Sequence, residues 1–287
     1  MILNETYTLS NGLTIPKVGL GTWLIPDNVA PAAVKCAVGL GYRHIDSAQD
    51  YGNERGVGEG IRSCGVPREQ LFVTTKVAAE LKTYELAAAS IDESLKKLDC
   101  GPADLVIIHS PQPWAEFRGP KRYFQENKAV WKALEDAYLG GKVKSIGVSN
   151  FLIDDLENIL EDCRIRPMVN QIKLHIGETP SSLVAYCKQQ DILVEAYSPI
   201  AHGAALKNED LARMAVRYGV TIPQLCIQYT LQLGTVSLPK SSNPAHIRSN
   251  VEADFTISEE DMAALENIGQ DYGEDSRWPV FSRKKGL

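Results

Sequence analysis

The sequence has no long apolar run and no paired metal-binding motif in its 287 residues. No hydrophobic stretch approaches the roughly 20 residues that a membrane-spanning helix needs, and the N-terminus lacks the basic start and apolar core of a secretion signal. The six cysteines are scattered without a Cys-x-x-Cys pair, which argues against a zinc site or a disulfide framework. We therefore expect a cytoplasmic protein with neither a membrane anchor nor a structural metal.

The charge balance excludes further classes of partner. Lys and Arg number 30 against 36 Asp and Glu, a net charge of -6. An acidic chain gives no reason to expect nucleic acid or an anionic membrane as a partner. No linker or shift in composition divides the sequence, so we expect a single domain over residues 1–287.

A short apolar strand followed by an amphipathic helix recurs along the chain, after a hairpin signalled by the Asn11-Gly12 turn. The expected strands are Lys17–Leu20, Arg43–Asp46, Leu71–Thr75, Leu105–His109, Ser145–Val148, Met168–Ile172, Leu193–Tyr197 and Val236–Leu238. Eight strands alternating with helices predict an α/β fold, a (β/α)8 TIM barrel with an N-terminal β-hairpin and extra C-terminal helices.

The alternative fold is an open, doubly wound sheet that binds a dinucleotide. That fold usually carries a Gly-x-Gly-x-x-Gly fingerprint after its first strand. The pairs Gly19-Leu-Gly21 and Gly56-Val-Gly58 do not continue into this fingerprint, so the closed barrel is favoured.

Polar side chains stand at the carboxyl ends of the expected strands, where barrel enzymes build their active sites. They are Asp46, Lys76, His109, Asn150, Gln171, Tyr197 and Lys240. Taken singly, each is most simply a cap, a solvated side chain or a packing residue. Together they predict an active site, because only the closure of a barrel would bring residues so far apart in sequence to one mouth.

Tyr51 follows the second expected strand and is the candidate proton donor. A free tyrosine has a pKa of about 10 and is a slow acid at neutral pH. We expect the Lys76 ammonium, held by Asp46, to lower that pKa, and His109 to orient a carbonyl oxygen beside the phenol. A proton donor at the oxygen suits carbonyl reduction, and the hydride must come from a cofactor because no side chain supplies one.

The segments HIDSAQDYGNE, VTTK, VIIHSP, GVSNF, NQIKLH, AYSPI and LPKSS resemble the signatures of the aldo-keto reductases, in order and over nearly the whole chain. The tail GEDSRWPVFS is similar to that of the bacterial 2,5-diketo-gluconate reductase-like branch. The resemblance implies a monomer that reversibly reduces aldehydes and ketones to alcohols with NADP(H) or NAD(H). Its partner would then be a small carbonyl or alcohol substrate.

The resemblance also implies a role for each matching residue. The catalytic tetrad would be Asp46, Tyr51, Lys76 and His109. The cofactor contacts would be Gly21, Thr22, Ser149, Asn150, Gln171, Tyr197, Ser198, Pro199, Ile200, Lys240, Ser241, His246 and Asn250. Substrate would meet Trp23 and Trp114 beside Tyr51 and His109, with Phe117 and Trp278 as further candidate aromatic walls.

The chain departs from the family pattern at His246, where an arginine usually follows the Lys-Ser pair. A histidine carries little charge at pH 7 and lacks the guanidinium fork that grips a phosphate. Arg248 lies two residues further on, and two such positions do not share a helix face. We therefore expect NADP(H) to bind, with a smaller preference over NAD(H) than is usual in the family.

A second departure is Ser110, which stands where many relatives carry a tryptophan and should widen the pocket or let water enter. The loop 110–127 that follows is long for a βα connection. It is either a structural lid or a selectivity loop for anionic or hydroxylated substrates.

Two other functions compete with carbonyl reduction. One is a sensor that retains the cofactor with little turnover, and an intact tetrad argues against it. The other is an unrelated barrel enzyme, such as a phosphosugar isomerase or a metal-dependent hydrolase. That function would need a glycine-rich phosphate loop or clustered His and Asp ligands, and the sequence has neither.

Overall fold

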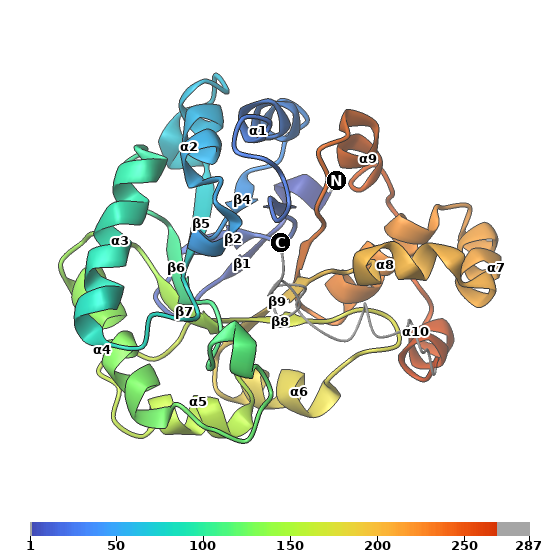
Figure 1. The fold of residues 1–287 in the computed structure, drawn as a ribbon. Helices are drawn as coiled ribbons and strands as arrows, with labels where there is room; N and C mark the ends of the chain where they lie inside the picture. The colour runs from blue at the N-terminus through green and yellow to red at the C-terminus, as the bar shows by residue number, and fades with distance from the viewer. Residues whose placement is uncertain (1, 269–287) are drawn as a thin grey trace.

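The computed structural model describes residues 2–268, which form a closed barrel of parallel strands ringed by helices (Figure 1). The strands lie in chain order: β3 (Leu20–Gly21), β4 (His44–Asp46), β5 (Phe72–Val77), β6 (Leu105–Ile108), β7 (Ile146–Ser149), β8 (Val169–Lys173), β9 (Leu193–Tyr197) and β10 (Val236–Leu238). Parallel bridges from Val18 to Ser237 and from Gly21 to Lys240 join the first strand to the last. The predicted (β/α)8 barrel is confirmed.

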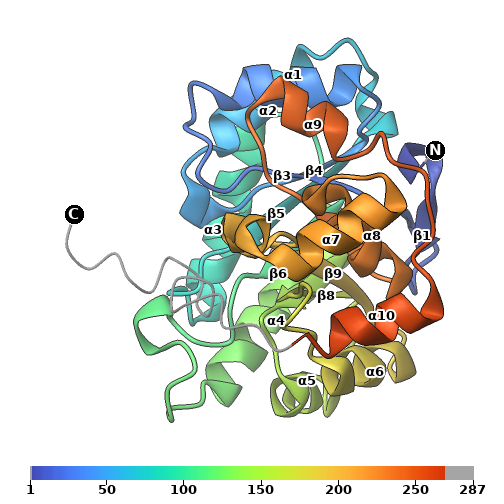
Figure 2. The same ribbon diagram turned by 90° about the vertical axis from the view of Figure 1, so that its right-hand side faces the viewer.

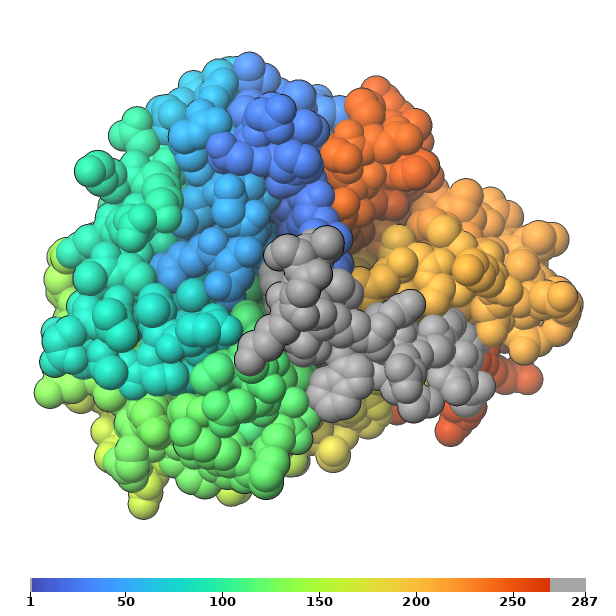
Figure 3. Space-filling model, viewed as in Figure 1, coloured from blue at the N-terminus to red at the C-terminus, as the bar shows by residue number. Residues whose placement is uncertain are grey.

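Helices follow the strands around the outside of the barrel (Figures 1 and 2). They are α1 (Ala30–Gly39), α2 (Glu54–Arg62), α3 (Tyr84–Leu98), α4 (Phe124–Leu139), α5 (Ile153–Leu160), α6 (Ser181–Gln189), α7 (Glu209–Tyr218), α8 (Ile222–Gln232), α9 (Pro244–Ser249) and α10 (Glu259–Glu266). The last two follow the final strand and are the extra C-terminal helices expected from the sequence. Helix α9 packs beside α1 (Figure 3), where the Tyr42 hydroxyl donates to the Ile247 carbonyl oxygen at 2.9 Å.

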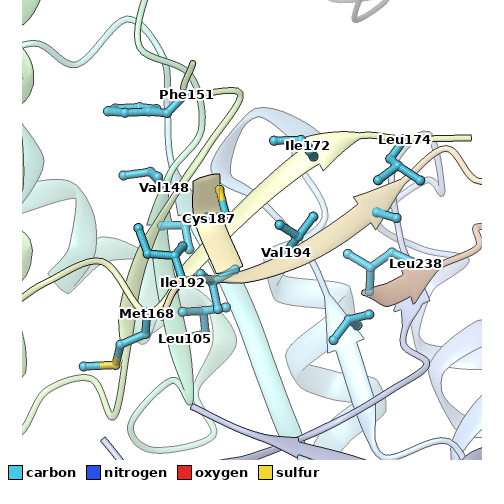
Figure 4. Close-up of a cluster of buried hydrophobic side chains, with 14 of the residues drawn as sticks. Leu105, Val148, Phe151, Met168, Ile172, Leu174, Cys187, Ile192, Val194 and Leu238 are labelled. Atoms are coloured by element: carbon cyan, nitrogen blue, oxygen red, sulfur yellow. The ribbon is translucent and has the colours of Figure 1, made fainter. Parts of the chain in front are cut away.

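The predicted N-terminal hairpin is present as β1 (Thr6–Thr8) and β2 (Thr14–Pro16), which pair antiparallel with Tyr7 opposite Ile15. Ile15 is fully buried and belongs to the same apolar cluster as Leu105 and Met168 of the barrel wall. Figure 4 shows part of this cluster, including Met168 and Val194. The hairpin therefore extends the core, while the opposite, carboxyl ends of the strands stay available for a site.

The glycine pair of α2 has a packing role. A Cβ on Gly56 would lie 1.9 Å from the carbonyl oxygen of Asp27, and a Cβ on Gly58 would lie 1.9 Å from that of Leu98. The helix thus presses directly against two stretches of backbone. These contacts explain the glycines without a phosphate-binding loop, in agreement with the barrel rather than the dinucleotide fingerprint.

We predict that Gly58→Ala destabilises the protein strongly, by about 3 kcal/mol, because neither backbone can withdraw from the added methyl group. The free energy of unfolding, measured in denaturant, tests this. Gly39→Ala is the matched control, since a Cβ there would meet no atom of the described residues within 4 Å. Equal stability of the Gly58→Ala protein and the wild type would contradict the close approach.

Candidate active site

The carboxyl ends of the strands surround a cavity of about 510 Å³. Most residues predicted from the sequence line it: Gly21, Trp23, Asp46, Tyr51, His109, Trp114, Ser149, Asn150, Gln171, Tyr197, Ser198, Pro199, Ile200 and Lys240. Four lining residues were not predicted: Leu24, His202, Gly203 and Leu238. The barrel therefore brings the motif residues to one mouth.

Lys76 of β5 is fully buried beneath this cavity and has three oxygen partners. Its Nζ donates to Asp46 Oδ1 at 2.6 Å and to the Ser47 carbonyl oxygen at 2.8 Å. It also lies 3.3 Å from the Tyr51 hydroxyl. A buried ammonium that is surrounded in this way is fixed in place, so its charge stays beside the phenol.

The predicted lowering of the Tyr51 pKa is wrong for this structure. Burial, followed by the carboxylates of Asp46 and Asp50, raises the pKa of Tyr51 well above its ordinary value. Burial is the main reason, and Asp46 adds to it both by its own charge and by pairing with Lys76 at 2.6 Å, so that the ammonium acts on the phenol as one half of an ion pair. Tyr51 is consequently held as a protonated phenol.

Gln171 of β8 links Asp46 to a second buried carboxyl group that the sequence analysis missed. Its Nε2 donates to Asp46 Oδ2 at 2.9 Å and to Glu195 Oε2 at 2.8 Å. Glu195 of β9 is fully buried, and burial, followed by the charge of Asp46, raises its pKa to about 8. A glutamate within the apolar run Leu193–Tyr197 was the available signal in the sequence.

A second network joins β6 through β9 at the mouth. Asn150 has a left-handed backbone (φ 63), which asparagine tolerates better than most residues, and its Nδ2 donates to the His109 carbonyl oxygen at 3.0 Å. The Tyr197 hydroxyl donates to Asn150 Oδ1 at 2.7 Å. Ser149 Oγ donates to the Gln171 carbonyl oxygen at 2.8 Å. Amide and hydroxyl groups are therefore held in fixed directions at one side of the cavity.

Asp50 contacts two residues of the cavity wall, His109 and Trp114, and the sequence analysis missed it as well. Its Oδ2 lies 2.9 Å from His109 Nδ1 and accepts from Trp114 Nε1 at 2.9 Å. Burial raises the pKa of Asp50, but hydrogen bonds from His109 and Trp114 outweigh it and leave the pKa below its ordinary value. Because an ionised carboxylate only accepts hydrogen bonds, Nδ1 of His109 carries a proton.

The histidine ring sits between two aromatic neighbours. The His109 ring meets Tyr51 edge to face, with 5.6 Å between ring centroids, and meets Trp114 in the same manner at 4.9 Å. Burial lowers the pKa of His109, while the contact with Asp50 opposes the shift. Phe117 packs against Trp114 at 5.6 Å but is not part of the cavity lining.

The expected effect of Ser110 on the pocket stays a prediction, because Ser110 itself is not part of the cavity wall that the described residues form. Ser110 is fully buried, its hydroxyl accepts from the Gln112 backbone N–H, and it does not line the cavity. Trp114 supplies the aromatic wall instead. Gln112 Nε2 donates to the carbonyl oxygens of Gly119 and Lys121. The loop 110–127 is therefore held in part by hydrogen bonds between its own residues. This supports the structural reading of the loop, and its contact with substrate stays a prediction.

Four residues expected to touch the cofactor do not line the cavity. They are Thr22, Ser241, His246 and Asn250. Thr22 is fully buried and donates from Oγ1 to the Asp46 carbonyl oxygen at 2.8 Å, so it supports the site from behind. His246 is exposed on α9, and Asn250 ends that helix. Trp278 and the tail that suggested a particular bacterial branch lie outside the described residues, so both stay predictions.

The fold and the site define a class of protein. A (β/α)8 barrel whose mouth holds a phenol beside a buried lysine–carboxylate pair is equipped to move a proton to or from a bound oxygen. The profile of the Aldo/keto reductase family matches residues 17–270. The chain belongs to this family.

Comparison with individual proteins agrees. The chain is 41% identical over 271 residues to the glyoxal reductase of Bacillus subtilis (strain 168), with 94% of each chain covered. It is 36% identical over 304 aligned positions to an aldehyde reductase of Saccharomyces cerevisiae, covering 97% of this chain and 96% of the relative. A crystal structure of a Bombyx mori aldo-keto reductase in complex with NADP matches with a TM-score of 0.82 and 31% identity, covering 96% of each chain.

These findings decide between the competing functions. The chain is an oxidoreductase of the aldo-keto reductase family, and its relatives give the sensor reading no support. Family membership likewise rules out the unrelated barrel enzymes. Within residues 2–268, no cluster of three or more metal-ligating side chains occurs, and no helix is long and apolar enough to cross a membrane.

We predict that Asp50→Ala lowers kcat/KM for a reactive aldehyde about tenfold, because His109 and Trp114 both lose their acceptor, while the cofactor Kd stays within about twofold. Steady-state kinetics and a fluorescence titration measure the two quantities. Glu116→Ala, which removes an exposed carboxylate from the neighbouring loop, is the control. An Asp50→Ala enzyme with wild-type kcat/KM would show that Asp50 does not organise His109.

Proposed function

We propose that this protein reduces aldehydes and ketones to alcohols with NADPH, reversibly, and that Tyr51 donates the proton. The observation that carries the proposal is the position of the Lys76 ammonium, 3.3 Å from the Tyr51 hydroxyl, with the His109 ring against the same phenol. The relatives named glyoxal reductase and aldehyde reductase support this substrate class.

The residues present fit a nicotinamide. A nicotinamide carboxamide has one acceptor oxygen and two N–H donors, and the amide oxygens of Asn150 and Gln171 on the cavity wall are acceptors for those N–H groups. Donation to the carboxamide oxygen would require Ser149 Oγ or Asn150 Nδ2 to exchange a present protein acceptor for the ligand. Tyr197 lies in the same wall and gives an aromatic face for the ring. The bound cofactor supplies the hydride that reduces the carbonyl carbon.

Tyr51 and Lys76 handle the proton. As the carbonyl carbon is reduced, negative charge develops on its oxygen, and the Tyr51 hydroxyl transfers its proton there. The raised pKa of Tyr51 keeps the phenol protonated until that moment. The phenolate left behind is stabilised by the adjacent Lys76 ammonium, which Asp46 keeps in position.

Asp50 determines how His109 contributes. With a proton on Nδ1, a neutral His109 is an acceptor at Nε2 and suits the hydroxyl of an alcohol. Donation from Nε2 to a carbonyl oxygen requires the imidazolium form, which the Asp50 carboxylate favours and burial opposes. His109 therefore orients the reacting oxygen through Nε2, as an acceptor from an alcohol hydroxyl when it is neutral and as a donor to a carbonyl oxygen when it is protonated.

The cofactor proposal is NADP(H), with limited discrimination against NAD(H). Lys240 is an exposed cation at the cavity edge, and Ser241 follows it, three residues before α9 begins at Pro244. Arg248 does not replace the family's arginine, since its Nη1 pairs with Glu252 Oε1 at 3.6 Å. The NADP complex of the Bombyx mori neighbour supports NADP as the ligand.

The monomeric state and the cytoplasmic location stay predictions.

We predict that Tyr51→Phe lowers kcat for aldehyde reduction by about 10³-fold, because the proton donor is lost, and leaves the NADPH Kd within about twofold. Stopped-flow turnover and a binding titration measure these effects. Tyr84→Phe removes a hydroxyl bonded to Asp136 on an outer helix and serves as the control. Substantial turnover by the Tyr51→Phe protein would refute the assignment of the proton donor.

We predict that His246→Arg raises the ratio of kcat/KM with NADPH to that with NADH about tenfold, because the guanidinium adds a charged, bidentate donor for the 2'-phosphate. Steady-state kinetics with both cofactors measures the ratio. Arg248→Ala is the control and should leave the ratio unchanged, because that arginine pairs with Glu252. A wild-type ratio in the His246→Arg protein would remove His246 from the phosphate site.

A further inference from the structure

Glu195 is a buried carboxyl group to which the proton-transfer mechanism assigns no role. It lies directly opposite Gln171 in the parallel register of β8 and β9, and none of its surface is exposed. Its Oε2 accepts the hydrogen bond from Gln171 Nε2 at 2.8 Å. Its Oε1 lies 3.8 Å from His44 Nε2, and within the described residues it has no hydrogen-bond partner.

The position is an unusual one for a carboxyl group. Barrel interiors are filled mainly by bulky apolar side chains, and burying a polar group there carries a desolvation cost. Burial raises the pKa of Glu195 to about 8, so the neutral acid dominates near pH 7 and reduces that cost. The titratable groups around it are Asp46, Lys76 and His44, and burial lowers the pKa of His44 to about 4.

Glu195 accepts one of the two N–H groups of the Gln171 side-chain amide. A primary amide has two N–H groups, and Gln171 gives one to Asp46 Oδ2 at 2.9 Å and the other to Glu195 Oε2. The inverted amide would place its carbonyl oxygen against Asp46 Oδ2 and against Glu195 Oε2, which is the accepting oxygen of the neutral acid when the acid proton lies on Oε1. The two acceptors together therefore fix one orientation, in which the carbonyl oxygen of Gln171 is the atom left for a ligand on the cavity wall.

Asp46 alone does not define this orientation. Its Oδ1 is committed to Lys76, and its Oδ2 can satisfy only one of the two N–H groups at its present position. Without Glu195, the second N–H would be buried without an acceptor, and the amide would be held only by Asp46 Oδ2, so it could turn about that single contact.

We propose that Glu195 is a positioning residue for cofactor recognition: it holds the Gln171 amide with its carbonyl oxygen toward the cavity, where that oxygen accepts the N–H of the nicotinamide carboxamide. This inference rests on the proposed function, since it requires a nicotinamide in the cavity. It adds a residue that acts through Gln171 and touches neither cofactor nor substrate.

The test compares NADP⁺ with its 3-acetylpyridine analogue, in which a methyl group replaces the carboxamide NH₂ and removes its donors. Kd values for both are measured by fluorescence titration near pH 7. In the wild type, the analogue should bind about tenfold more weakly, the effect of one lost hydrogen bond. This ratio of Kd values reports the Gln171 contact without any turnover.

The variants test whether an acceptor oxygen at position 195 is needed, independently of an ionisable carboxyl group. Glu195→Gln retains an acceptor oxygen and should keep most of the Kd ratio. Glu195→Met retains the volume without an acceptor, and the ratio should fall below about threefold because the contact to the carboxamide is lost. Thr74→Val is the matched control: Thr74 is also fully buried and bonds to His44 at 3.0 Å, and its loss should leave the ratio at the wild-type value.

Each outcome has a definite meaning. A wild-type ratio in Glu195→Met, or an equal fall in Glu195→Met and Thr74→Val, overturns the positioning role. If Glu195→Met does not fold, Glu195→Asp replaces it, because the shorter side chain withdraws its carboxyl group from Gln171. A wild-type Kd ratio in the Glu195→Asp protein also overturns the inference. Failure of the wild type to bind NADP⁺ would instead refute the proposed function.

Discussion

The burial of the Lys76 charge is the constraint on which the site depends. An ammonium with no exposed surface is stable in a protein only when oxygen acceptors surround it. All three acceptors of Lys76 come from the segment 46–51, so that segment has to fold over β5 in one conformation. Asn53 then anchors the neighbouring loop, donating to the Thr22 carbonyl oxygen at 2.8 Å. The position of Tyr51 is therefore a consequence of neutralising Lys76.

The same constraint limits the charge that the barrel interior can hold. Lys76 balances one carboxylate, and Asp46 takes that place at 2.6 Å. Glu195 is joined to Asp46 through Gln171, and a second carboxylate there would meet the first in a medium of low polarity. Its pKa of about 8 follows from burial first and from Asp46 second. Near pH 7 the neutral acid therefore accepts the Gln171 hydrogen bond without disturbing the catalytic ion pair.

The barrel, and the meeting of Asp46, Tyr51, Lys76 and His109 at one mouth, could be predicted from the sequence because strand ends in a closed barrel converge. Asp50 could not, because its direction depends on the 3-10 helix Gln49–Tyr51, which turns it toward a histidine 59 positions later in the chain. Glu195 was hidden for another reason: both faces of a parallel barrel strand are buried, so alternation does not reveal which residues point inward. The direction of the Tyr51 pKa shift could not be predicted, because it depends first on the burial of the phenol and then on the nearby carboxylates of Asp46 and Asp50.

The two ends of the proposed cofactor site differ in how many contacts fix their side chains. At the proposed nicotinamide end, Asn150, Gln171 and Ser149 are buried and linked to one another, so a change in one affects the others. At the expected phosphate end, Lys240 and His246 are exposed, where solvent and salt weaken each charge and few partners constrain it. A side chain there can change without disturbing the ion pair beneath Tyr51. If the proposed roles hold, cofactor preference is the property of this site most open to change, and the buried ion pair beneath Tyr51 is the least.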